Sequence, residues 1–222
     1  MKKNDSLPFW DAVKVYFGES LVKVFLVMFF IPVITVLFFI ASFQIMGGTG
    51  GINGPMGGAM LFFSLAYMIF MVDLRINNAN LPGNKFLKTV KGGFGTYVKA
   101  SVTITVVSTI ISLLYCIIAA VLYLADITML FFSPAFCFAT GISTFVLIAM
   151  IGFLRIIENT SIRMVVYSIF MFVGMFLIIL LFHTVKSINA AVAAISFVVS
   201  ILLIVISEVV SISYYKKNVW EK

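Results

Sequence analysis

Charged residues, cysteine and histidine are all scarce in this sequence. Only 10% of the 222 residues are charged, against about a quarter in a typical soluble domain. The two cysteines, Cys116 and Cys137, lie in apolar runs and match no zinc-binding spacing. There is one histidine, His183, with no second metal ligand close by in the sequence. No Gly-Lys-Ser/Thr follows the glycine-rich segment 47–55, so a P-loop is missing. We therefore expect no catalytic residues, metal or cofactor in this chain.

Most of the sequence consists of long apolar runs. Hydrophobic residues make up 63% of the chain, and the mean hydropathy is +1.19. A single soluble core of this size cannot bury so much apolar surface, whereas a run of about 20 apolar residues is long enough to span a bilayer. The sequence therefore predicts an all-α integral membrane protein. The six predicted transmembrane segments are 22–46, 56–74, 101–124, 135–157, 162–182 and 188–212.

The basic residues fall almost entirely on one side of these segments. Of the 15 Lys and Arg, four lie before or at the start of the first segment, five lie between the second and third, two flank the connection between the fourth and fifth, and three follow the sixth. Only Lys186 lies on the other side. Cytoplasmic loops carry the excess of Lys and Arg, so both termini are predicted to be cytoplasmic, with the protein in the cell membrane. This placement accounts for the net charge of +7, and no nucleic-acid partner is expected.

Three regions follow from this topology. Residues 1–21 form a cytoplasmic N-terminus, 22–212 a transmembrane domain, and 213–222 a basic cytoplasmic tail. Within the first region, residues 7–21 have the apolar spacing of one helix face, with polar residues opposite. A helix lying in the membrane interface, in contact with lipid, is therefore predicted there. Its apolar face comprises Phe9, Trp10, Val13, Tyr16, Phe17 and Leu21.

The longest predicted cytoplasmic connection, residues 75–99, contains a second amphipathic helix. A turn precedes this helix, and Gly92-Gly93 is typical of a helix end. The helix could rest its lysines on anionic lipid headgroups, or it could be contacted by another protein. The turn residues are Leu81, Pro82, Gly83 and Asn84; the expected apolar face is Phe86, Leu87 and Val90, and the expected basic face is Lys85, Lys88 and Lys91.

Ionisable residues in membrane segments are functional candidates by default. Asp73, Asp126 and Glu158 lie near segment ends, so we expect anchoring or local pairing there, with Asp73 beside Arg75. Glu208 lies deeper, roughly two turns before Tyr214-Tyr215-Lys216. It is the candidate for a packing or gating role.

Small residues in the apolar segments predict where helices approach each other closely. Pro32 is expected to kink the first segment. The small residues are Gly141, Gly152, Gly174, Ala190 and Ala194.

These features together resemble the permease subunit of type-2 ATP-binding-cassette (ABC) exporters. An interfacial helix precedes six segments, the longest inner loop carries a short amphipathic helix, and residues 81–86 match the family's Leu-Pro-x-x-Arg/Lys pattern. The resemblance implies that residues 7–21 are an elbow helix and that the loop is a coupling helix docked on a separate ATPase, which binds ATP and Mg²⁺. The connection 182–191 is shorter than the family's usual pair of re-entrant helices requires. The implied ATPase contacts are Leu81, Pro82, Gly83, Asn84, Lys85, Phe86, Leu87, Lys88, Val90 and Lys91.

The resemblance also implies a second permease, identical or paralogous, and export of cargo between the two subunits. The cargo is expected to be hydrophobic or amphipathic, such as a peptide, lipid or drug, because the segments contain few charges. Two other functions stay open. One is the substrate-binding membrane subunit of an energy-coupling-factor importer, although the outer loops offer mostly Gly, Ser and Thr. The other is a membrane scaffold that transports nothing.

Overall fold

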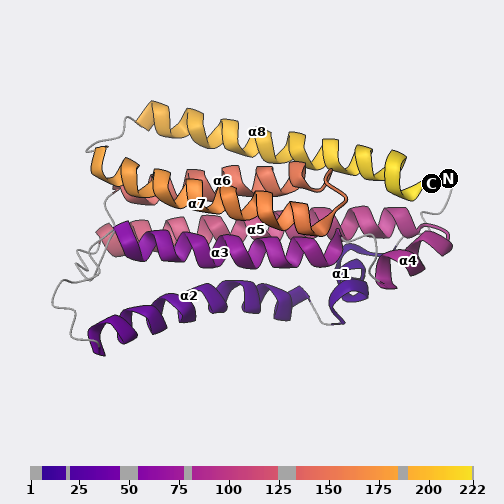
Figure 1. Cartoon of the computed structure of the whole chain (residues 1–222), viewed down its shortest axis with the longest axis horizontal. Helices are drawn as coiled ribbons and strands as arrows, with labels where there is room; N and C mark the ends of the chain where they lie inside the picture. The colour runs from indigo at the N-terminus through magenta and orange to yellow at the C-terminus, as the bar shows by residue number, and fades with distance from the viewer. Residues whose placement is uncertain are drawn as a thin grey trace.

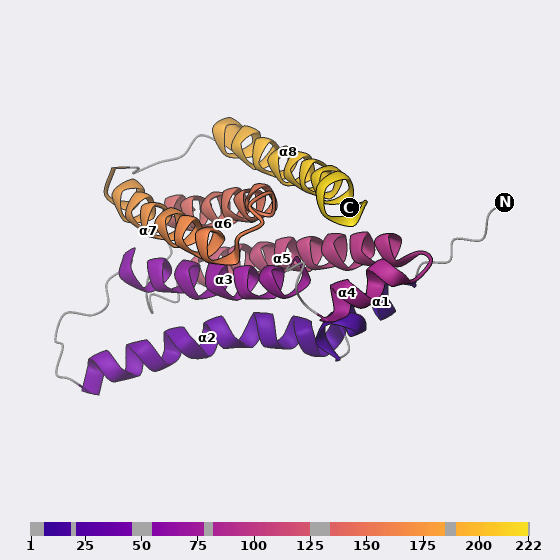
Figure 2. The same ribbon diagram turned by 45° about the vertical axis from the view of Figure 1, so that its right-hand side comes forward.

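The computed structural model describes residues 7–18, 21–45, 55–77, 82–124, 134–184 and 190–221. Within these ranges every regular element is a helix. Six long helices run side by side, and two short ones, α1 and α4, lie at one end together with the last turns of α8 (Figures 1 and 2). The elements are α1 (Phe9–Phe17), α2 (Leu21–Ile45), α3 (Pro55–Ile76), α4 (Pro82–Thr89), α5 (Gly93–Leu124), α6 (Pro134–Leu154), α7 (Thr160–Thr184), α8 (Ala190–Tyr215) and a last wider turn, η1 (Lys216–Trp220).

The six long helices coincide with the six apolar runs, and their all-helical character is confirmed. Within the described ranges, Gly93–Ile118 and Ala194–Trp220 are long and apolar enough to cross a membrane. The bent pair Phe9–Phe17 and Leu21–Thr35 adds a third candidate if it is counted as one span. These apolar helices are compatible with a membrane protein.

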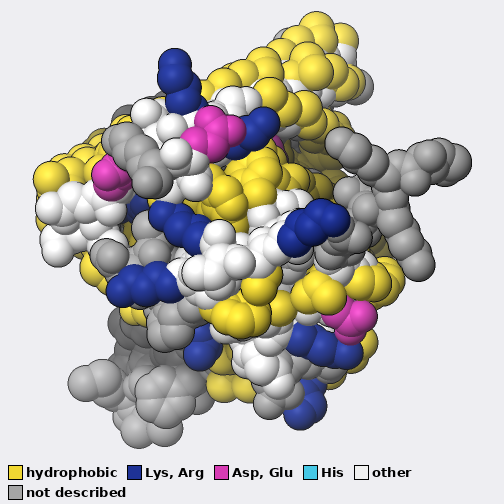
Figure 3. Space-filling view, turned by 90° about the vertical axis from the view of Figure 1, so that its right-hand side faces the viewer, with side chains coloured by type: hydrophobic (Ala, Val, Ile, Leu, Met, Phe, Trp, Pro, Cys, Tyr) yellow, Lys and Arg dark blue, Asp and Glu magenta, His cyan; other side chains and the backbone are white. Residues whose placement is uncertain are grey.

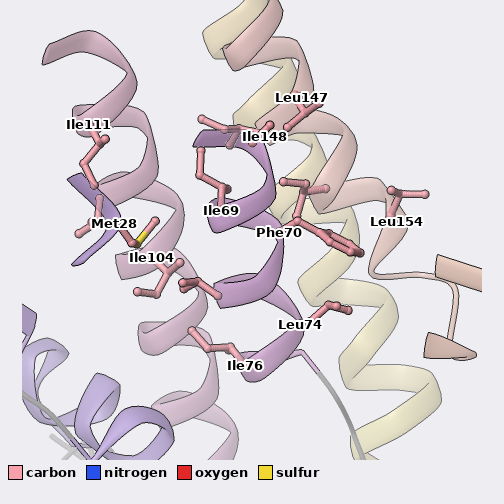
Figure 4. Close-up of a cluster of buried hydrophobic side chains, with 14 of the residues drawn as sticks. Met28, Ile69, Phe70, Leu74, Ile76, Ile104, Ile111, Leu147, Ile148 and Leu154 are labelled. Atoms are coloured by element: carbon pink, nitrogen blue, oxygen red, sulfur yellow. The ribbon is translucent and has the colours of Figure 1, made fainter. Parts of the chain in front are cut away.

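Helix α3 lies at the centre of the bundle and contacts α2, α5, α6 and α7. Its apolar side chains meet those of α2, α5 and α6 in a buried cluster (Figure 4). Ile69 and Phe70 are each only 3% exposed. Lipid tails are as apolar as these side chains, so close van der Waals packing, rather than escape from water, stabilises such a cluster in a bilayer.

The helix contacts predicted at two glycines are confirmed. A Cβ added at Gly152 would lie 2.5 Å from the Ser207 hydroxyl, which shows that α6 and α8 cross there with no room for a side chain. A Cβ at Gly141 would lie 2.7 Å from the Cys116 sulfur of α5. Ala194, in contrast, is exposed.

The turn from α4 into α5 depends on two consecutive glycines. Gly92 has a φ of 79°, in the left-handed region that favours glycine. A Cβ at Gly93 would lie 1.8 Å from the backbone oxygen of Leu87, so only glycine lets the start of α5 approach α4 this closely. The predicted helix end at Gly92-Gly93 is therefore confirmed.

The C-terminal segment, expected as a basic tail, continues α8 and then packs back on the bundle. Val219 is buried, and the Trp220 ring lies 5.5 Å from the Phe94 ring and 5.7 Å from the Tyr97 ring, between centroids. Tyr97 also stacks on Tyr215 at 4.6 Å. These aromatic contacts fix the end of the chain against the start of α5.

Gly93→Ala should destabilise the protein by about 3 kcal/mol, because the added methyl group meets backbone that cannot rotate away. Gly18→Ala is the matched control. Gly18 has a positive φ of 64°, which Gly93 does not, but nothing lies within 4 Å of its added Cβ, so only the conformational cost of about 1 kcal/mol applies. Thermal unfolding in detergent measures both, and equal losses would contradict the close approach of α4 and α5.

Candidate functional site

Helix α4 has one face anchored in the bundle and one face exposed. Asn84 and Leu87, three residues apart, are 1% and 3% exposed, whereas Phe86 is 62% exposed. The predicted apolar face of Phe86, Leu87 and Val90 is therefore divided, since Leu87 turns inward while Phe86 and Val90 turn outward. The exposed residues that follow Asn84 are Lys85, Phe86, Lys88, Thr89, Val90 and Lys91.

The turn expected at residues 81–84 is instead the first turn of α4 from Pro82 onward. Proline suits the first helical position, where its missing N–H costs no intrahelical hydrogen bond. Leu81 lies outside the described residues, as does Asp126. Pro82 and Gly83 belong to the helix backbone.

Asn84 connects α4 to two other helices. The Tyr16 hydroxyl of α1 donates a hydrogen bond to Asn84 Oδ1 at 2.8 Å, and Asn84 Nδ2 donates to the backbone oxygen of Ile76, the last residue of α3, at 2.7 Å. Burial raises the pKa of Tyr16 above its usual value, so this hydroxyl remains a donor. Lys88 also donates to the backbone oxygen of Val219. Asn84 and Lys88 thus attach α4 to α1, to the end of α3 and to η1.

Helix α1 packs on the bundle through the inner part of its predicted apolar face. Val13 and Tyr16 are buried, whereas Phe9 and Trp10 are 49% and 66% exposed. Phe17 is partly buried, and the Arg75 guanidinium lies 5.6 Å from the centre of its ring. Exposed aromatic rings beside a buried helix face suit a helix at a membrane boundary.

We call the end of the molecule that carries α1, α4 and η1 the α4 end. Basic side chains are spread around apolar side chains on this end (Figure 3). Acidic side chains are fewer there, and Asp11 is paired with Lys14 at 2.9 Å. The exposed basic residues of this end are Lys14, Arg75, Lys85, Lys88, Lys91, Lys216 and Lys217. The surface therefore attracts an acidic partner or an anionic membrane.

A buried ion cluster of Asp73, Arg155 and Glu208 lies inside the bundle. Arg155 Nη2 lies 2.6 Å from Asp73 Oδ1, and Arg155 Nη1 lies 2.6 Å from Glu208 Oε2. The three residues are 2%, 4% and 8% exposed. Ser101 and Thr105 of α5 donate hydrogen bonds to the Glu208 carboxylate at 2.8 and 2.9 Å. The cluster therefore joins α3, α5 and α8 to the end of α6.

Two expectations for charged residues change with this cluster. The prediction that Asp73 lies near water and pairs with Arg75 is wrong, because the Asp73 side chain points into the bundle and Arg75 points outward. Glu208, the candidate for a packing or gating role, is buried and makes an ion pair and hydroxyl contacts. Sequence reasoning missed Arg155, which was counted only as a loop cation. The signal was present, since one Arg and two acids stand at the same ends of three apolar runs.

A chain of polar contacts connects α4 to the ion cluster. Asn77, at the end of α3, donates to Asp73 Oδ1 at 2.8 Å and accepts from the Tyr97 hydroxyl at 2.6 Å. Arg163 donates to the backbone oxygens of Asn77 and Ile157, which fixes the turn between α6 and α7. Asn84 donates a hydrogen bond to the backbone oxygen of Ile76, the residue before Asn77. A shift of α4 would therefore displace the end of α3 directly.

Within the described ranges, no three His, Cys, Asp or Glu side chains gather as a metal site. The arrangement instead combines an anchored surface helix, a basic exposed surface and a rigid ionic connection between helices. It suits contact with a partner at the α4 end and transmission of that contact into the bundle.

Arg155→Met should destabilise the protein by about 3–5 kcal/mol, because two buried carboxylates then lose their partner. The triple variant Asp73→Asn/Arg155→Met/Glu208→Gln should recover much of this loss, since no unpaired charge remains buried. Chemical or thermal unfolding in detergent gives both values. A triple variant no more stable than Arg155→Met would contradict the pairing.

Known proteins offer no independent assignment for this arrangement. No family model matches the chain, no curated protein matches it, and no solved structure matches it. The α4 surface and the ion cluster are therefore the features that bear on function.

Proposed function

We propose that the chain is the membrane-spanning permease subunit of an ATP-driven ABC exporter. In this proposal a separate ATPase docks on the exposed face of α4, and α4 passes its movement to the bundle. The observation that carries the proposal is Phe86, a large aromatic side chain 62% exposed on a short helix whose opposite face is buried. Exposed aromatic side chains on a rigid support are typical anchors of protein interfaces.

The proposed topology has six membrane spans with both termini in the cytoplasm of the cell. The shortest of the six long helices, α6, has 21 residues, which gives about 31 Å at 1.5 Å per residue, near the thickness of a bilayer core. The exposed basic residues gather at the α4 end. The positive-inside rule supports placing that end on the cytoplasmic side.

The surface of α4 suits a soluble partner with an acidic groove. Lys85, Lys88 and Lys91 are exposed around Phe86, so a partner would meet one apolar anchor ringed by positive charge. Such a rim guides association, while the buried anchor supplies most of the affinity. The ATPase of an ABC transporter would supply the hydrolysis of ATP, with its Mg²⁺, that this chain is not expected to perform.

Movement of α4 would reach the membrane helices by a short route. Asn84 and Leu87 hold α4 against the bundle, and the close contact at Gly93 ties it to α5. Docking would therefore tilt the ends of α3 and α5 together. The ion cluster then links α3 and α5 to α6 and α8, so the four helices would move as a unit against a second permease, identical or paralogous.

The proposed cargo is hydrophobic or amphipathic. The outer faces of α7 and α8 are apolar and exposed, as Phe172 and Val198 show at 62% and 56%. Such faces would meet lipid, the second permease, or a cargo passing between them. A pathway with such walls favours a peptide, lipid or drug over a small ion.

Cysteine labelling tests the topology. In a Cys116→Ala/Cys137→Ala background, Lys85→Cys and Lys217→Cys should react with a membrane-impermeant maleimide only after the cells are opened. Thr49→Cys, in the predicted outer connection 47–55, should react in intact cells. Labelling of Lys85→Cys in intact cells would contradict the proposed orientation.

Co-purification tests the partner. The tagged chain, extracted in mild detergent from its native host, should bring an ABC ATPase with it. Phe86→Asp should reduce recovery of that ATPase at least about tenfold, since a charge in place of a buried anchor costs 1.4 kcal/mol or more.

Phe86→Leu is the matched control and should retain most of the ATPase. Because Phe86 is exposed, neither variant should change the thermal unfolding of the chain itself. Equal recovery of the ATPase with Phe86→Asp, or no ATPase with the unaltered chain, would contradict the proposal.

A further inference from the structure

A groove of about 720 Å³ lies between α1, α2, α3 and α7, near the α4 end. In this part of the bundle α2 lies beside α3, and α1 lies next to the first turn of α2 (Figures 1 and 2). This volume is within the range of about 300–1,000 Å³ found for small-molecule sites. Neither the proposed ATPase contact at α4 nor the ion cluster uses this groove.

Two cations stand at one end of the groove. Lys23 of α2 and Arg75 of α3 both line it, and both are exposed. Among the described residues that line it, none is acidic. Phe17 lies under the Arg75 guanidinium at 5.6 Å and so limits where that group can turn. This end of the groove is therefore suited to an anion.

The rest of the groove is apolar and rich in methionine. Met28, Met68, Met71 and Met164 come from α2, α3 and α7. Methionine side chains are unbranched and adapt to flexible ligands. Met68 is seven residues from Arg75 on α3, which places it about 10 Å further along the bundle. The charged end and the apolar wall thus follow one another along the direction of the helices.

We propose that this groove binds an anionic membrane phospholipid, with its phosphate between Lys23 and Arg75 and part of an acyl chain along the four methionines. The order of charges and apolar side chains matches the order of headgroup and tail. A membrane lipid fits better than a soluble anion, because Met71 and Met164 are 39% and 42% exposed on the flank of the bundle. The proposal requires a membrane, but it does not depend on an ATPase docking at α4.

Binding of phosphatidylglycerol to the purified full chain, measured by native mass spectrometry, tests this site. Phosphatidylcholine, which is zwitterionic and has no net charge, is the comparison. Lys23→Gln/Arg75→Gln should weaken phosphatidylglycerol binding by about tenfold or more, since each cation near a lipid headgroup adds measurable attraction. Lys216→Gln/Lys217→Gln removes the same charge from the C-terminal end and should change binding by less than about twofold.

Met71→Trp provides a second variant that keeps the charge and narrows the groove. It should also reduce phosphatidylglycerol binding, while the unaltered chain prefers this lipid to phosphatidylcholine. Equal losses in the two charge variants would overturn the proposal, because general attraction to basic residues would then explain the binding. Equal binding of the two lipids, or full binding by Met71→Trp, would overturn it as well.

Discussion

The guanidinium of Arg155 is buried among four helices, and burial requires that its charge be paired. Removing an ion from water costs several kcal/mol, which only close partners and satisfied hydrogen bonds offset. Asp73 and Glu208 supply the opposite charges, and hydroxyl groups of α5 complete the contacts to Glu208. Since these groups must meet at one point, the positions of α3, α5, α6 and α8 along the bundle axis are fixed relative to one another. Apolar packing alone would allow these helices to slide, because Val, Ile and Leu contacts are similar at every turn.

The α4 end is built on this fixed frame. Asn77 is bonded to Asp73, and the neighbouring residue Ile76 accepts the hydrogen bond from Asn84 that positions α4. Gly92, and Gly93 at the start of α5, then allow α4 to lie close to the chain that follows it. As a result, a helix of eight residues, too short to be stable alone in water, presents its exposed face in a defined orientation. This rigidity is what makes α4 a suitable contact for the ATPase we propose.

The sequence predicted the parts of this fold that depend on local pattern. The apolar runs located the six long helices, and the spacing of Val13 and Tyr16 located the inner face of α1. Gly92-Gly93 marked the end of α4, because the requirement for glycine is local.

The ion cluster could not be predicted in the same way, since Asp73, Arg155 and Glu208 are more than fifty residues apart in the sequence. Asp73 and Arg155 looked like ordinary charges near the ends of apolar runs, and Glu208 was distinguished only by its depth. Only the packing of α3 against α6 and of α6 against α8 brings the three together. The split of the α4 face had the same cause, because the choice between Phe86 and Leu87 is made by the neighbouring helices.

Photo-crosslinking from position 86 is the most direct test of the proposed docking of α4. A photoreactive phenylalanine analogue would replace Phe86 in the native membrane, and mass spectrometry would identify what it captures. The account predicts a crosslinked product that contains an ABC ATPase and that is lost when the analogue is moved to the buried position Leu87. A product that contains only lipid would contradict the account, because Phe86 would then contact the membrane and no ATPase would dock on α4.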